Sequence, residues 1–71
     1  MRAMDKHPMT KRREEMGLTQ EALAERVGCK RWMVNSIEVG RRFPSRRLAL
    51  RIEAEIGVDA GALLGLSEAA Q

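Results

Sequence analysis

Apolar residues recur along this 71-residue chain at the three- and four-residue spacing of helices, in short runs separated by glycine. In one run, Leu23, Ala24 and Val27 fall on the same side of a helix. The hydroxyl of Thr19 can accept a hydrogen bond from a free backbone N–H at the start of this run, and Gly28 can end it. The pattern predicts a helix of about two turns.

A second short run covers about residues 30–39 and stops at Gly40. Val34, Ile37 and Glu38 fall on one side of this run, at about 100° per residue. The opposite side carries Trp32, Asn35, Ser36 and Val39. We therefore expect a second short helix with an interior side and an outward side.

The same spacing predicts a helix over about residues 6–16, before these two runs. Pro8 suits its first turn, because the missing N–H of proline is no loss there. Met9, Arg13 and Met16 fall on one side of this helix.

Two further helices follow the loop "GRRFPS". Ser45 can cap the first of them, which ends at Gly57. Its apolar stripe consists of Leu48, Ile52 and Ile56. Asp59 can cap a last short helix that holds Leu63 and Leu64.

Size and composition agree with a small helical protein. We expect a single domain over residues 1–71, frayed at residues 1–5 and 67–71. Trp32 and Phe43 are the two aromatic residues of the chain. Ala, Leu, Glu and Arg dominate, and this mixture favours helices over strands. The predicted fold class is all-α, with a core of aliphatic side chains.

Basic residues are concentrated in the middle of the chain, although the net charge is only +3. Residues 26–51 carry eight basic side chains and one acidic one, Glu38. Residues 52–71 carry four acidic side chains and no basic one. This distribution is typical of proteins that bind a polyanion, although a solvated basic surface has the same composition.

The sequence contains no pattern of residues that indicates catalysis or metal binding. Cys29 and His7 are single, so neither a disulfide nor metal-ligand spacing is present. We expect Cys29 to cover the core from a turn and His7 to lie on the surface without a role. We also expect a cytoplasmic protein that is not an enzyme, needs no cofactor and has no membrane or small-molecule partner.

Two short helices joined by a tight turn with glycine are the signature of a helix-turn-helix motif. We place this motif at about residues 19–39, with Ala24 where the helices cross and Gly28 in the turn. The outward side of the second helix is then free to enter the major groove of DNA, which is wide enough for a helix.

The residues around this motif resemble those of a known family. The order "R-x-x-x-G-L-T-Q-E-x-L-A-x-x-x-G", then "V-x-x-I-E-x-G-R-R-x-P-S" and finally "I-G-V" is similar to the XRE family of λ-repressor and Cro-type regulators. The resemblance covers roughly residues 9–66. It implies a compact five-helix, λ-repressor-like domain of prokaryotic or phage origin that binds double-stranded operator DNA, usually as a homodimer.

The resemblance also implies roles for individual residues. The positions that match base contacts are Arg31, Trp32 and Ser36. The positions that match contacts with the DNA backbone or groove edge are Gln20, Lys30, Met33, Asn35, Arg41, Arg42 and Arg46. Arg13 and Glu38 match a pair that often forms a salt bridge between the first and third helices. Leucines near the end that the core does not need could form a two-fold dimer contact; the candidates are Leu63, Leu64 and Leu66.

Four positions depart from the family pattern. Lys30 stands where a small hydroxyl residue commonly caps the third helix, and Arg12 replaces a usual core leucine. Gly61 lies inside the last helix and costs it about 1 kcal/mol relative to alanine. Trp32 stands where the family mostly has small or polar residues.

The exposed ring of Trp32 has three interpretations. It can contact a thymine methyl group or a sugar edge, it can stack on a neighbouring arginine, or it can belong to a protein interface. The first two favour a sequence-specific, DNA-binding transcriptional regulator. The alternative is a protein-interaction module, such as an antitoxin-like partner that sequesters another protein through Trp32, Met33 and Val39.

Overall fold

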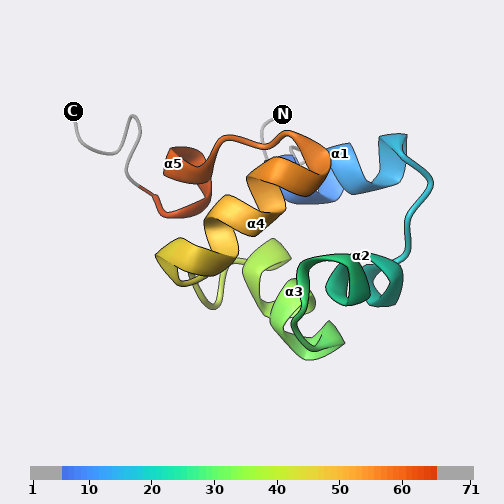
Figure 1. The fold of residues 1–71 in the computed structure, drawn as a ribbon, viewed down its shortest axis with the longest axis horizontal. Helices are drawn as coiled ribbons and strands as arrows, with labels where there is room; N and C mark the ends of the chain where they lie inside the picture. The colour runs from blue at the N-terminus through green and yellow to red at the C-terminus, as the bar shows by residue number, and fades with distance from the viewer. Residues whose placement is uncertain (1–5, 66–71) are drawn as a thin grey trace.

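The structure, a computed structural model, describes residues 6–65, which form five helices and no strand (Figure 1). The helices are α1 (Pro8–Glu15), α2 (Gln20–Val27), α3 (Arg31–Glu38), α4 (Arg46–Ile56) and α5 (Ala60–Leu63). The predicted all-α fold and the helix-turn-helix at residues 19–39 are confirmed. The ends that we expected to fray, residues 1–5 and 67–71, lie outside the described residues, as does Leu66.

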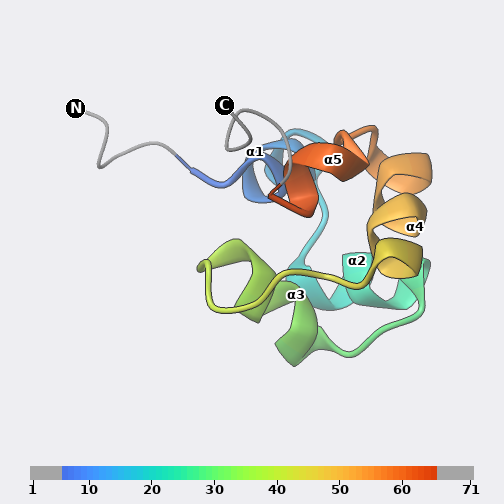
Figure 2. The ribbon, with the colours of Figure 1, turned by 90° about the vertical axis from the view of Figure 1, so that its left-hand side faces the viewer.

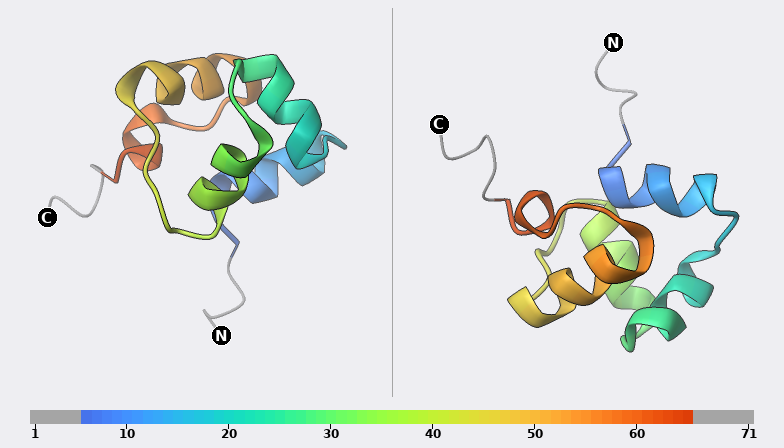
Figure 3. Two further views of the ribbon diagram at one scale, coloured as in Figure 1. Left: turned by 90° about the horizontal axis from the view of Figure 1, so that it is seen from below. Right: turned by 45° about the horizontal axis from the view of Figure 1, so that its top comes forward.

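The helices are arranged in two groups. In two views at right angles, α2 and α3 lie together below, α1 and α5 lie together above, and α4 runs beside both groups (Figures 1 and 2). α4 contacts both α2 and α5, so it joins the two groups. This arrangement leaves one side of α3 without a helix packed over it (Figure 3, left).

One hydrophobic core connects all five helices. The fully buried side chains include Met9, Leu23, Val34, Ile37, Ile52, Ile56 and Leu63. The apolar stripes predicted for α2, α3 and α4 therefore face the interior. The first helix ends at Glu15, one residue earlier than predicted, so Met16 belongs to the turn that follows and is exposed.

Side-chain caps fix the starts of three helices as predicted. The hydroxyls of Thr19 and Ser45 and the carboxylate of Asp59 each accept a hydrogen bond from the N–H three residues further on, at 2.9–3.1 Å. These bonds satisfy N–H groups that have no partner within the helix. Lys30 occupies the corresponding position before α3, and its side chain makes no cap hydrogen bond.

Arg12 packs differently from the leucine that it replaces. Its Nε donates a hydrogen bond of 2.8 Å to the carbonyl oxygen of Ile56, at the last residue of α4. This carbonyl has no partner within its helix, and the guanidinium also complements the negative end of the helix dipole. A polar contact thus joins α1 to α4, while Met9 supplies the buried side chain of α1.

Candidate nucleic-acid interface

The turn between α2 and α3 fixes the direction in which α3 leaves. Gly28 has a φ of +77°, a conformation that residues with a side chain rarely adopt, and the N–H of Cys29 donates to the carbonyl of Ala24 at 2.9 Å. Arg51 donates to the carbonyl of Val27 at 3.3 Å and closes the turn from α4. Cys29 packs against the core, and partial burial raises the pKa of its thiol.

The predicted ion pair between Arg13 and Glu38 is present and joins α1 to α3. Arg13 donates from Nε to Oε2 at 2.8 Å and from Nη2 to Oε1 at 3.1 Å, a bidentate arrangement. The two side chains are only 12% and 5% exposed. Nη1 of Arg13 also donates to the carbonyl of Leu18 at 2.8 Å, so the guanidinium holds the segment before α2 as well.

The protonation states favour this pair at neutral pH. Burial acts to raise the pKa of Glu38, but the hydrogen bonds from Arg13 and Gln20, together with the charge of Arg13, outweigh it, so the pKa lies below its usual value. The hydrogen bond with Glu38 raises the pKa of Arg13. Both groups are therefore charged, and removing either one leaves a nearly buried charge without its partner.

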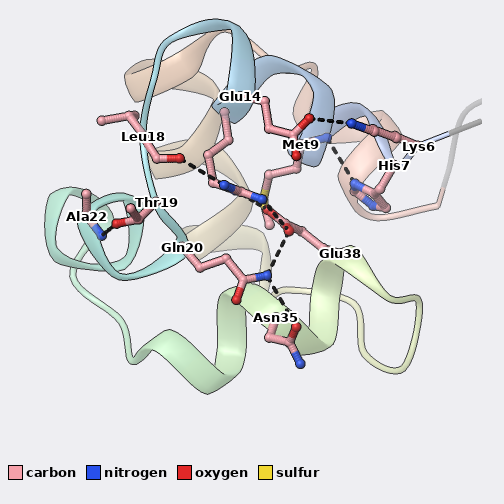
Figure 4. Close-up of polar contacts among 11 residues, drawn as sticks. Lys6, His7, Met9, Glu14, Leu18, Thr19, Gln20, Ala22, Asn35 and Glu38 are labelled. Atoms are coloured by element: carbon pink, nitrogen blue, oxygen red, sulfur yellow. Dashed lines mark hydrogen bonds and ion pairs between the residues drawn. The ribbon is translucent and has the colours of Figure 1, made fainter.

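Gln20 connects the first residue of α2 to α3. Its Nε2 donates to Oε1 of Glu38 at 2.9 Å and to Oδ1 of Asn35 at 3.2 Å (Figure 4). The amide therefore braces the outward side of α3 against α2. Contact between Gln20 and DNA stays a prediction.

The outward side of α3 presents three exposed side chains together. Arg31, Trp32 and Asn35 line a shallow hollow on the surface, and the Trp32 ring is 53% exposed. Ser36 is half-buried and lies further along the same side. Met33, which we expected at the edge of this surface, is half-buried and packs against the core, so only part of its side chain remains accessible.

The Trp32 ring has an arginine partner. The Cζ atom of Arg42 lies 5.2 Å from the ring centroid, within the distance of a cation–π interaction. Of the three interpretations of this exposed ring, a cation–π contact with a neighbouring arginine is thus present in the structure. Contact of the ring with DNA or with another protein stays a prediction.

The basic residues of the middle segment divide into two groups. The exposed cations on α3 and before and after it are Lys30, Arg31, Arg41, Arg42, Arg46 and Arg47. Arg26 and Arg51 instead line a second surface hollow beside Glu25 and Glu55, and Arg26 pairs with Glu55 at 3.2 Å. Fewer positive charges therefore lie around α3 than the eight basic residues between positions 26 and 51 would indicate.

His7 has a structural role that we did not predict. Its Nδ1 accepts a hydrogen bond of 3.0 Å from the N–H of Met9 and caps α1. Burial lowers the pKa of His7, and the charge of Glu38 offsets part of this effect. The sequence signal is its position directly before Pro8, since proline favours the first helical residue and so marks the residue before it as the cap.

The leucines expected at a dimer contact have different positions. Leu63 is buried inside the core and cannot contribute to a surface contact in this structure. Leu64 packs partly against the core. Two apolar side chains to which we assigned no role are more exposed: Phe43 is 71% exposed, and Leu50 is about half exposed.

Residues 6–65 contain no group of three or more His, Cys, Asp or Glu side chains that could hold a metal ion. Within the same part of the chain, every helix is too short or too polar to cross a membrane.

Comparison with known proteins adds to this geometry. The model of a family described as helix-turn-helix matches residues 9–63. The chain belongs to this helix-turn-helix family. The matched segment contains α2 to α5 and all of α1 except Pro8, together with the interface described above, in agreement with the resemblance to XRE regulators. No solved structure is a significant match to the chain.

One curated relative of this helix-turn-helix protein is an uncharacterized HTH-type transcriptional regulator from the archaeon Methanothermobacter thermautotrophicus. The two are 53% identical over 45 residues. The alignment covers 63% of this chain and 65% of the relative, so somewhat less than two thirds of either protein is shared.

Proposed function

We propose that this protein is a sequence-specific, double-stranded-DNA-binding transcriptional regulator of a prokaryotic cytoplasm. α3 enters the major groove with Arg31 and Trp32 toward the bases, and the cations that flank it contact phosphates. The observation that supports this proposal most is the bare, outward side of α3, braced by Gln20 and framed by exposed cations. The proposal assigns no catalytic step, cofactor or small-molecule ligand to the chain.

Base reading and phosphate contact are divided between two exposed arginines. Arg31 lies at the first residue of α3, where a guanidinium can donate two parallel bonds to O6 and N7 of guanine. Arg42 lies in the loop after α3, where we expect it to contact a phosphate. Arg31→Ala should therefore relax base preference, with about 1–3 kcal/mol of discrimination lost at one position. Arg42→Ala should weaken binding to all sequences alike.

Selection of bound sites from a random duplex library, repeated with both variants, measures this difference. Uniform loss of affinity in both variants would show that Arg31 does not read bases. The same selection tests the proposed homodimer, because a palindrome with half-sites about one helical turn apart requires two chains. A single unpaired half-site would contradict the dimer.

A protein-interaction module remains the second candidate, and exposed apolar side chains favour it. Val39 and Phe43 are both more than half exposed, near α3 and in the loop that follows it. Binding to random duplex DNA at rising salt separates the two functions. A DNA-binding protein loses affinity steeply as salt rises, whereas a module for protein contact binds DNA weakly at every salt concentration.

A further inference from the structure

The contact between Trp32 and Arg42 joins a base-reading position to a phosphate-contact position. Trp32 lies in the first turn of α3, and Arg42 lies in the loop after α3. The Arg42 side chain reaches back along the helix until its Cζ lies 5.2 Å from the centroid of the ring. The loop runs from the end of α3 back toward the start of α4 (Figure 3, left).

The backbone of Arg42 is held by the same side of α3. The carbonyl oxygen of Ser36, one turn after Trp32, accepts hydrogen bonds from the N–H of Arg41 at 2.9 Å and of Arg42 at 3.3 Å. Both the backbone and the side chain of Arg42 are therefore anchored to one strip of the helix. An arginine held at both ends has less rotamer freedom than an exposed arginine normally has.

The donors of Arg42 also remain available. Among residues 6–65, none of the side-chain hydrogen bonds or ion pairs involves its guanidinium, so its N–H groups can meet a phosphate. We propose that Trp32 is a positioning residue that holds Arg42 ready to bind a DNA phosphate. This inference rests on the proposed DNA-binding function. Because part of the freedom of Arg42 is already lost in the free protein, binding costs less free energy.

The test is a double-mutant cycle with the intact chain, measured as affinity for duplex DNA at fixed salt. Trp32→Ala should weaken binding about three- to tenfold, the range that corresponds to ordering one long side chain. In the background of Arg42→Ala, the same change should weaken binding clearly less than it does in the wild type, because only the contact of the ring itself with the groove is then lost. Arg41→Ala is the matched control, because Arg41 is exposed in the same loop and anchored to the same carbonyl. In that background, Trp32→Ala should keep its full effect.

Two substitutions separate a ring that positions Arg42 from an apolar group that touches DNA. Trp32→Phe keeps an aromatic face and should retain most of the affinity, whereas Trp32→Leu should behave like Trp32→Ala. Equal affinity of the Phe and Leu variants would overturn the inference. So would losses that simply add in the double variant of Trp32 and Arg42.

The single tryptophan of the chain gives an independent readout in the free protein. Arg42→Ala should increase the quenching of Trp32 fluorescence by acrylamide, and Arg41→Ala should leave it unchanged. Equal quenching in the wild type and Arg42→Ala would show that the stack does not persist in solution. A wild-type chain that binds no DNA would refute the proposed function, whereas a wild type that binds with additive losses would refute this inference alone.

Discussion

His7 gives the stability of α1 a dependence on pH. Its neutral imidazole accepts the N–H of Met9, but an imidazolium has no lone pair for this bond and also meets the positive end of the helix dipole. The pKa of His7 is lowered in the folded protein, so the unfolded chain binds a proton first as pH falls. His7 therefore contributes its full share of the free energy of unfolding above about pH 6.5, the ordinary pKa of histidine. This contribution is lost as pH falls through the lower pKa of His7 in the folded protein.

We predict that His7→Ala lowers the free energy of unfolding by about 1 kcal/mol at pH 7.5, the usual worth of an N-cap. This difference from the wild type should shrink as pH falls toward 5, in urea unfolding followed by circular dichroism. Glu38 does not interfere, since its lowered pKa places its titration below this window. His7→Asn is the control, because asparagine caps without titrating. A wild type and an Asn variant with the same pH profile would contradict the assignment.

Single residues also show where prediction from sequence stops. The exposure of Trp32 follows from its phase on the helix, which is a local property. Its partner Arg42 lies in an irregular loop, and no periodicity gives the direction of a side chain there. The Arg13–Glu38 pair was predictable because both residues match family positions, even though α2 separates them.

At the scale of the element, helix starts were predictable because a cap bonds to an N–H three residues away. The contact of Arg12 with the carbonyl of Ile56 spans 44 residues, and nothing in the local sequence indicates it. α3 differs from the other helices described here because no side chain caps its first turn. Lys30 has the extended backbone of an N-cap residue but has no oxygen to accept an N–H.

We predict that Lys30→Ser stabilises the protein by about 1 kcal/mol relative to Lys30→Ala, because serine supplies the missing cap. Both variants lack the positive charge, so their comparison isolates the cap, and thermal unfolding measures it. If Lys30 contacts a phosphate, both variants should bind DNA more weakly than the wild type, and by the same factor. Equal stability of the Ser and Ala variants would show that α3 does not need a side-chain cap.

At the scale of the whole molecule, folding divides a charge cluster that looks continuous in the sequence. Eight basic residues fall within residues 26–51, but Arg26 and Arg51 lie at the junction of α2 and α4, beside acidic side chains. Of the other six, Arg31 lies on α3 and Arg47 inside α4, and the four that we expect to contact phosphates are Lys30, Arg41, Arg42 and Arg46. Composition predicts a polyanion partner, and this stays a prediction, while the positions of the charges depend on how the helices pack.

We predict that the affinity of one chain for random duplex DNA falls with a slope of about −3.6 in log K against log salt, if each of these four cations neutralises one phosphate. Fluorescence anisotropy over a salt series measures this slope. Arg46→Gln should reduce its magnitude by about 1. Arg26→Gln removes the same charge from the Glu55 pair and should leave the slope unchanged. An equal change in both variants would show that the binding surface extends over α2.

The Arg13–Glu38 pair limits what can be transplanted from this protein. A peptide cut at residues 19–39 keeps the carboxylate of Glu38 but loses the guanidinium that α1 supplies. A scaffold that received this motif would therefore carry an anionic side chain with no counter-ion beneath the outward side of α3. A successful chimera must carry α1 along, or exchange Glu38 for a neutral residue that its new neighbours can accommodate.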